Sequence, residues 1–490
     1  MTSRALLVAL AALTALSATN AEALSPSAEV AAQRGPQIFN AVYDSLRKWG
    51  SVVHPNGMSL YLATVPEGVM LHHGNARNET PTELQWLAYE IEHAEMFARD
   101  RRGGPPGGGK PPGDDDEDGR QDLKRRRAAQ VPLEDADTPS AGWLHTYRTT
   151  RALRFLYLDG MSGDKGRSGV LDTQDLLLRG VRDGDQPPLT PPGKSPSRGP
   201  PGEHDRAVDL CRLCEDWELQ GIIRTEGAGF EIIKCDFLDG LEQIQSLQRS
   251  SAGGDGHRGP HGRPPGGHHG GPPYGGPPGM PGGRRDPDDR YREVGSSRTL
   301  LDYSSMVSAF FFPVNITNPD SERAELPRLL GTTKAEMLAI RDYLTQVIQA
   351  RHDAPITAFN WRDVADLVVR RYGAKVSAMA ADVDSVEDMA RQVRFLLEVY
   401  VDYSVEDEKL RNGAAQERCA TFYIQTMPLE TEADRLLFAA FKAVNARICG
   451  ALFEVRELVV GDAGAGEEAL EEAKDVLKAL MEYLAWSIFE

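Results

Sequence analysis

Three tracts rich in glycine, proline and charged residues interrupt this chain of 490 residues, and they limit what it can fold into. They lie at about residues 101–140, 186–202 and 251–290. Each has too few large apolar side chains to offset the conformational entropy that ordering would cost. We therefore predict that all three are disordered. The first two become insertions in a domain at residues 24–250, and the third becomes a linker to a second domain at residues 291–490.

The linker also contains four histidines: His257, His261, His268 and His269. Histidine-rich tracts can bind metal ions. A solvated, flexible linker is the simpler interpretation, because nothing in this tract would hold ligands in a fixed geometry. The sequence therefore assigns no metal site.

Residues 24–250 have the pattern of an α+β domain. Val69–His73 is a strand-like run that ends in a histidine followed by a glycine. Gly221–Arg224 and Phe230–Phe237 are two further strand segments, and the turn signal Glu226–Gly229 lies between them. We expect a β-sheet here, with a hairpin as part of it.

The last part of the chain has the pattern of a helical bundle, with no convincing strand after about residue 315. Helix starts are marked by the capping box Thr333-x-x-Glu336 and by three similar patterns: Asn360-x-x-Asp363, Asp384-x-x-Glu387 and Thr431-x-x-Asp434. Gly373 is expected to end the second of these helices. We predict an all-α domain that serves for packing or for binding a protein partner.

The first residues predict export from the cell. Residues 1–23 combine one basic side chain, the apolar run Ala5–Leu16 and small residues suited to cleavage, which together are typical of a secretory signal peptide. Asn78 and Asn315 begin N-x-Thr sequons for N-glycosylation, in agreement with a secreted glycoprotein.

The net charge argues against two classes of main partner, and the hydropathy argues against a membrane span. The formal net charge of −18 argues against nucleic acid or an anionic membrane surface. Apart from the signal peptide, the apolar burst Met306–Val314 is much shorter than the roughly 20 residues that a membrane-spanning helix needs. We therefore expect no transmembrane segment.

The chain has five cysteines, and in an oxidising compartment some of them should form disulfides. An odd count leaves at least one without an intramolecular partner. Cys211 and Cys214 form a lone C-x-x-C pair on the apolar face of a predicted helix. This placement favours core packing over a redox or metal site, because zinc sites usually have a second pair.

Glu231 is the carboxylate with the most unusual expected position. Strand alternation places it on one face with Ile233 and Phe237. A carboxylate on an apolar face is costly unless it is paired or used in chemistry. Glu231 is therefore a functional group, a residue at a sheet edge whose face is only partly covered, or half of a salt bridge to an arginine such as Arg148 or Arg154.

Four segments carry a resemblance to a family of uncharacterised secreted proteins of filamentous fungi. They read V-P-E-G-V-M-L-H-H-G, W-L-A-Y-E-I-E-H-A-E-M-F-A, G-W-L-H-T-Y-R-T-T-R-A-L-R-F-L-Y-L-D-G-M-S and G-F-E-I-I-K-C-D-F. This resemblance implies no activity.

A second resemblance has mechanistic content, because the order of elements over about residues 65–240 is similar to ADP-ribosyltransferase-like domains. In that family a strand ends in His-Gly, an aromatic residue precedes a helix, and a later strand carries a glutamate. Here His73 and Gly74 match the first motif, Trp86 the second and Glu231 the third. The resemblance implies that NAD is the cofactor, bound by His73, Gly74 and Trp86.

In this interpretation Glu231 is the catalytic residue. Cleavage of NAD at the nicotinamide ribose passes through an oxocarbenium-like state, and a nearby carboxylate stabilises its positive charge. Three departures from the family are visible. Trp86 replaces the usual tyrosine, and Leu87 replaces the phenylalanine that usually follows it. Gly229 stands where arginine-modifying transferases commonly have a second glutamate.

Two classes of function therefore remain open. The first is a secreted NAD-dependent ADP-ribosyltransferase or NAD glycohydrolase. The second is a non-catalytic secreted interaction or structural protein on a degenerate ADP-ribosyltransferase-like fold.

Overall fold

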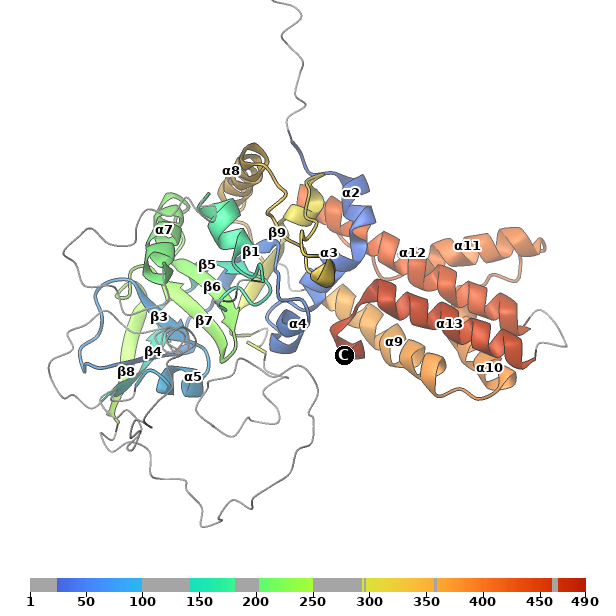
Figure 1. Cartoon of the computed structure of the whole chain (residues 1–490), viewed down its shortest axis with the longest axis horizontal. Helices are drawn as coiled ribbons and strands as arrows, with labels where there is room; N and C mark the ends of the chain where they lie inside the picture. Colours follow the sequence, from blue (N-terminus) through green and yellow to red (C-terminus); the bar gives the residue numbers. More distant parts are fainter. Residues whose placement is uncertain are drawn as a thin grey trace, which may run out of the picture.

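The computed structural model describes residues 24–98, 142–180 except 165 and 167, 202–249, 293–294, 297–356, 359–460 and 466–490. They form an α/β lobe around one mixed sheet and a lobe of helices beside it (Figure 1). The expected order, a part built on a sheet followed by a helical part, is thus confirmed. The predicted signal peptide and, except for residue 202, the three predicted disordered tracts lie outside the described residues.

The sheet has nine strands in the described part of the chain, in the order β8-β4-β2-β3-β7-β6-β5-β1-β9. Neighbouring strands are antiparallel except for β5 and β6, which run parallel. Their bounds are β1 Ser59–Val65, β2 Met70–Asn75, β3 Gln85–Ala88, β4 Trp143–Thr149, β5 Leu153–Leu158, β6 Gly221–Glu226, β7 Gly229–Lys234, β8 Leu241–Gln248 and β9 Leu300–Ser308.

The predicted hairpin is present as β6 and β7, in the middle of the sheet. Every residue of both strands is buried, including the charged ones. The hairpin is therefore covered on both faces, and its charged side chains must find partners inside the protein.

Short helical segments pack around the sheet. α5 contacts β2 and β3, α7 contacts β6, and α8 contacts β9, while the π-helical segment η1 lies against α7 and α8. Their bounds are α5 Ile91–Glu95, η1 Thr173–Leu178, α7 Glu203–Asp216 and α8 Lys334–Ala350. α5, α7 and η1 bring side chains to the β6–β7 hairpin and so build the candidate site.

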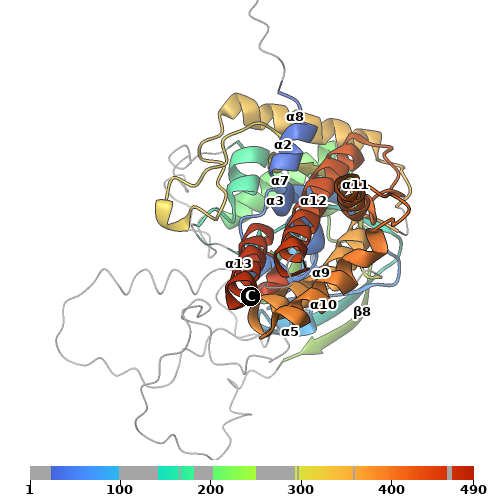
Figure 2. The same ribbon diagram turned by 90° about the vertical axis from the view of Figure 1, so that its right-hand side faces the viewer.

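The second lobe is a bundle in which α12 is central, with α13 on one side and α11 on the other (Figure 2). The bounds are α9 Trp361–Ala381, α10 Val386–Leu397, α11 Glu408–Thr421, α12 Glu432–Val460 and α13 Glu467–Leu484, with a 3₁₀ turn η5 at Glu398–Tyr400. Among the described residues, α12 is long and apolar enough to cross a membrane, but 61% of its apolar window is buried inside the protein. That burial is what a core helix shows.

Three of the predicted helix starts are confirmed, and one of them is Thr431, whose Oγ1 accepts a hydrogen bond from Asp434 N at 3.1 Å at the start of α12. Thr333 caps α8 together with Glu336, and Asn360 caps α9 together with Asp363. α10 begins one residue later than predicted, because the Ser385 side chain accepts the capping hydrogen bond.

Gly373 does not end α9, which continues to Ala381. A Cβ atom built on Gly373 would lie 2.3 Å from Ile488 Cδ1, so the missing side chain leaves room for the C-terminal segment. The glycine at position 373 therefore allows a close packing contact and does not mark the end of the helix.

The two lobes share elements across the predicted linker. β9 follows that linker in sequence but pairs with β1 at the edge of the sheet. Conversely, two helices from the first part of the chain, α2 (Ala28–Gln33) and α3 (Gly35–Tyr43), pack against α12 of the bundle. The next helix, α4, spans Lys48–Val53. One continuous hydrophobic core joins the sheet and the bundle.

Two disulfides form in the described residues, in agreement with the sequence. Cys211 in α7 bonds Cys235 just after β7, and Cys419 in α11 bonds Cys449 in α12. Cys214 is a free, buried thiol whose pKa is raised by burial, so it packs as an apolar residue.

Candidate functional site

A cluster of charged side chains is buried where the β6–β7 hairpin meets α5 and α7. Arg224 of β6 and Glu231 of β7 are direct cross-strand partners. Because partners in such a pair point to the same face of a sheet, both side chains emerge side by side. Arg224 is 0% exposed and Glu231 is 1% exposed, so neither charge is solvated.

Arg224 binds Glu231 through a short ion pair. Its Nη2 lies 2.5 Å from Glu231 Oε1 and 2.6 Å from Glu203 Oε1, and its Nη1 donates to Gln174 Oε1 at 3.0 Å. Burial lowers the pKa of Arg224, but the carboxylates of Glu203 and Glu231 raise it more, so the net shift is upward. The guanidinium therefore stays charged and fixes both carboxylates.

A second arginine extends the network outward. Arg206 Nη1 contacts Glu203 Oε2 at 2.6 Å, and its Nε and Nη2 both donate to the Asp175 carboxylate at 2.8 Å. This fork of two parallel hydrogen bonds fixes the direction of the guanidinium. The network thus ties α7 and η1 to the hairpin through Glu203.

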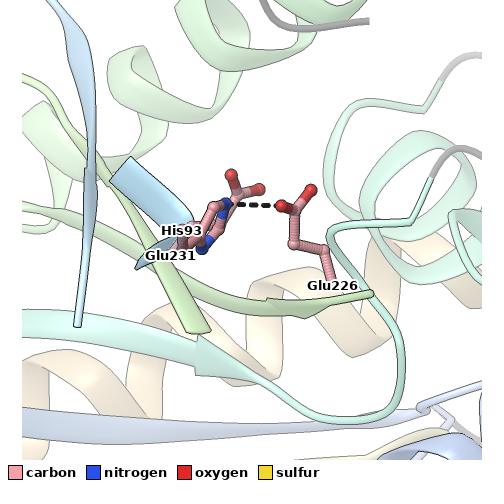
Figure 3. Close-up of side chains that lie close together, drawn as sticks. All are labelled: His93, Glu226 and Glu231. Carbon is pink, nitrogen blue, oxygen red and sulfur yellow. Dashed lines mark ion pairs between the residues drawn. The ribbon is translucent and has the colours of Figure 1, made fainter. Parts of the chain in front are cut away.

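His93 of α5 also reaches this cluster. Its Nε2 lies 2.5 Å from Glu226 Oε1 at the end of β6 (Figure 3). The ring is 3% exposed, and its Nδ1 is buried without a hydrogen-bond partner in the described residues. Burial lowers the pKa of His93, but Glu226, Glu231 and Glu90 raise it more, and the net shift is upward.

His93, Glu226 and Glu231 together could hold a metal ion. One potential ligand atom from each lies within 4.8 Å of the others. Figure 3 shows both carboxylates beside the imidazole ring. The carboxylates of Glu226 and Glu231 place negative charge beside the His93 ring, so a positive charge between the three side chains would be stabilised.

The surroundings of Glu231 match the salt-bridge interpretation. Its partner is Arg224, whereas the sequence suggested Arg148 or Arg154. Arg148 instead pairs with Glu242 on the surface. The salt-bridge alternative therefore describes the observed contact, with a different arginine.

The predicted cofactor residues lie on β2 and β3. His73 is 3% exposed, and its Nδ1 is hydrogen-bonded to the main-chain oxygen of Trp86 at 2.7 Å. Burial lowers the pKa of His73 to about 4, which the Trp86 carbonyl partly offsets, so the ring is neutral. Trp86 is half-buried, and its indole Nε1 has no hydrogen-bond partner among the described residues.

Gly74 has a packing role in the structure. A Cβ atom built on it would lie 2.1 Å from the main-chain oxygen of Ala94 and 2.8 Å from the main-chain nitrogen of Ala98. The glycine therefore lets β2 approach α5, the helix that carries His93.

The structure does not bring the predicted residues into one site. The pairs His72–Ala88 and Ala88–Glu231 place these three residues on one face of the sheet. The adjacent residue, His73, must then point to the opposite face. Trp86 shares the face of Glu231 but lies opposite Ile233, further along β7.

Arg224, Glu226 and His93 were not predicted from the sequence. For Arg224 the sequence did contain a signal. Arg224 and Glu231 are equally distant from the two-residue turn Gly227–Ala228, so in a tight hairpin they must be cross-strand partners. No comparable signal exists for His93, because only the tertiary fold brings α5 to the hairpin.

Comparison with known proteins places this site in a region shared with proteins of a yeast. Residues 28–253 match the family model of the YPL277C N-terminal domain. All residues of the buried cluster lie in that range, whereas β9 and the helical bundle lie outside it. No solved structure matches the chain.

Two relatives come from the yeast Saccharomyces cerevisiae. Uncharacterized protein YPL277C is 32% identical over 228 residues, which cover 43% of this chain and 42% of the relative. Uncharacterized protein YOR389W is 31% identical over 214 residues, which cover 43% of this chain and 33% of the relative. The chain thus spans less than half the length of either relative, and its similarity lies with an uncharacterised family found in a yeast.

Proposed function

We propose that this chain is a secreted, non-catalytic protein that acts by binding a protein partner. The observation that carries this proposal is the Arg224–Glu231 ion pair, whose side chains are 0% and 2% exposed. A carboxylate in this position stabilises the fold and offers no surface to a substrate as large as a dinucleotide.

The residues that the resemblance assigned to NAD do not fit that cofactor. His73 and Glu231 belong to opposite faces of the sheet, so they cannot contact the two riboses of one NAD molecule in a single cleft. The space beside Gly74 is filled by the backbone of α5. We therefore derive no step through NAD.

Secretion is part of the proposal and has three supports. Residues 1–23 have the composition of a signal peptide. The two disulfides are typical of proteins from an oxidising compartment. Asn78 and Asn315 are both exposed, as acceptors of N-linked sugars must be.

The helical lobe offers a surface suited to a protein partner. α10, η5, α11 and the turns beside them carry large apolar side chains that are exposed: Phe395 64%, Val399 68%, Tyr403 61%, Leu410 67% and Phe422 48%. Large apolar side chains exposed on elements that contact one another are a feature of protein-binding surfaces.

One substitution separates the two classes of function. Glu231→Gln leaves Arg224 with a single buried carboxylate, and we expect the free energy of unfolding to fall by about 3 kcal/mol. The matched control is Glu242→Gln, which breaks an ion pair whose side chains are both 52% exposed. It should cost about 1 kcal/mol or less.

The same proteins are then assayed for nicotinamide release from NAD. We expect no release by the wild-type protein, together with a destabilised Glu231→Gln variant. Nicotinamide release by the wild type that Glu231→Gln abolishes, without loss of stability, would overturn the proposal in favour of an NAD-consuming enzyme.

A further inference from the structure

We propose that His93, Glu226 and Glu231 form a binding site for a divalent transition-metal ion, with Zn²⁺ as the representative ion. The sequence assigned no metal site, and the proposal does not depend on which partner the helical lobe binds. It rests on the convergence of three ligating groups in the buried cluster.

The distances suit a single ion after small side-chain movements. His93 Nε2 and Glu226 Oε1 are 2.5 Å apart, and all three ligand atoms lie within 4.8 Å of one another. Zinc binds nitrogen and oxygen at about 2.0–2.2 Å, so ligands around one ion lie roughly 3–4 Å apart. Glu226 ends its strand and keeps 12% of its side chain exposed, so it can make the adjustment.

The charges around the site favour a cation. Glu226 and Glu231 place two carboxylates close together in a buried environment, where their repulsion is weakly screened. Arg224 is directed at Glu231 and Glu203 by its hydrogen bonds. A divalent ion between His93 and the two carboxylates would reduce the repulsion between these carboxylates.

The second ring nitrogen of His93 points to an unseen partner at this histidine, while Nε2 is the atom that faces Glu226. His93 is 97% buried, given its 3% exposure, yet Nδ1 has no hydrogen-bond partner in the described residues. Most buried polar atoms are paired, and an exception commonly indicates an unseen water or ion.

The surroundings would hold the ligands in place. Arg224 fixes Glu231 and is itself held by Glu203 and Gln174. Gly163 closes the site from the loop after β5: its nitrogen donates to Thr225 O at 2.7 Å, and a Cβ atom on it would lie 3.0 Å from Glu231 Oε1. Supporting contacts of this kind orient the ligands of metal sites.

The ligand set also defines which ions should bind. An imidazole with two carboxylates suits Zn²⁺ and related transition-metal ions, whereas Mg²⁺ and Ca²⁺ prefer oxygen ligands alone. We therefore expect Zn²⁺ to raise the melting temperature of the mature protein, and Mg²⁺ and Ca²⁺ at equal concentration to leave it unchanged.

The decisive experiment measures zinc by elemental analysis after equilibrium dialysis of the full mature chain. We expect one Zn²⁺ per chain in the wild type and at least tenfold weaker binding in His93→Gln and in Glu226→Gln. The matched control is His352→Gln, which removes a histidine that contacts Glu218 and Asp353 at the surface. That control should keep the bound zinc.

A second control separates this site from the histidine-rich tract. A variant with His257, His261, His268 and His269 changed to serine should keep its high-affinity zinc. Titration with Co²⁺ adds a readout that a purely structural role would not give, since d–d absorption bands should appear in the wild type and not in His93→Gln. Absence of bound zinc in the wild type, or its loss only in the serine variant, would overturn the proposal.

Discussion

At single residues, the structure explains charges that the sequence left ambiguous. Glu231 looked either catalytic or paired, and its cross-strand neighbour Arg224 supplies the pair.

Asp159 is a second buried carboxylate, 8% exposed, whose Oδ1 accepts a hydrogen bond from the Ser59 nitrogen at 2.9 Å. Burial raises the pKa of Asp159 to about 7, an effect that this hydrogen bond only partly offsets. This group therefore couples stability to pH.

The direction of this pH dependence follows from the pKa of Asp159 in the folded and in the unfolded chain. Folded Asp159 keeps its proton up to about pH 7, whereas an aspartate in the unfolded chain loses its proton at about pH 4. The contribution of Asp159 to stability is therefore fully present below about pH 4 and is lost as the pH rises towards 7. A difference of about 3 pKa units corresponds to about 4 kcal/mol.

Asp159→Asn should remove this dependence, because an amide does not titrate and can still accept the Ser59 hydrogen bond. In denaturant unfolding at pH 4, 5.5 and 7, we expect the variant to gain stability relative to the wild type as the pH rises. Asp205→Asn, at an exposed position of α7, should show no such trend. A constant difference between Asp159→Asn and the wild type across this range would contradict the assignment.

Elements whose formation depends on local chemistry were predicted well. The capping boxes of α8 and α9 and the β6–β7 hairpin all appear where the sequence placed them. Features that depend on distant contacts were not predictable in this way. Gly373 resembled a helix end because nothing local reveals that Ile488 packs against it. The same limit applied to His93, since its helix meets the hairpin only in the folded chain.

The close packing of β2 against α5 can be tested by a substitution at Gly74. Gly74→Ala would place a methyl group 2.1 Å from the main-chain oxygen of Ala94, so the helix must shift. We expect a loss of about 1–3 kcal/mol in the free energy of unfolding, as is typical of overpacking. The matched control is Gly227→Ala, because nothing lies within 4 Å of the added atom. Equal, small effects of both changes would show that α5 is loosely held.

Over the whole molecule, the sequence indicated two domains joined by a linker, but the structure joins them through shared elements. β9 completes the sheet from beyond the linker. Phe39 of α3 contacts Phe441 of α12, with ring centroids 4.7 Å apart. The composition of the three tracts located the interruptions, but it could not reveal pairing across them, because pairing is a property of the assembled core.

This arrangement leads to a prediction about proteolysis. The sequence alone suggests that cleavage at Arg284 or Arg285 should release an independent helical fragment. We expect instead that the two pieces remain associated under native conditions. The β1–β9 pairing, the Arg47–Asp366 ion pair at 2.9 Å and the hydrogen bond from Trp49 Nε1 to Ser487 O at 2.9 Å all bridge the cut.

Limited trypsin digestion followed by gel filtration tests this expectation. Both disulfides lie within one piece or the other, so no covalent bond spans the cut and any association must come from packing. A denaturing gel should show the helical fragment beside smaller pieces of the first part of the chain, because the other two tracts also contain lysine and arginine. The native digest should elute as one species near the position of the intact protein. Because the pieces share one core, separating them in denaturant should also unfold both, and refolding should require that they be mixed. A helical fragment that elutes alone and keeps its helical circular dichroism would show that the bundle is independent of the sheet, as the sequence first suggested.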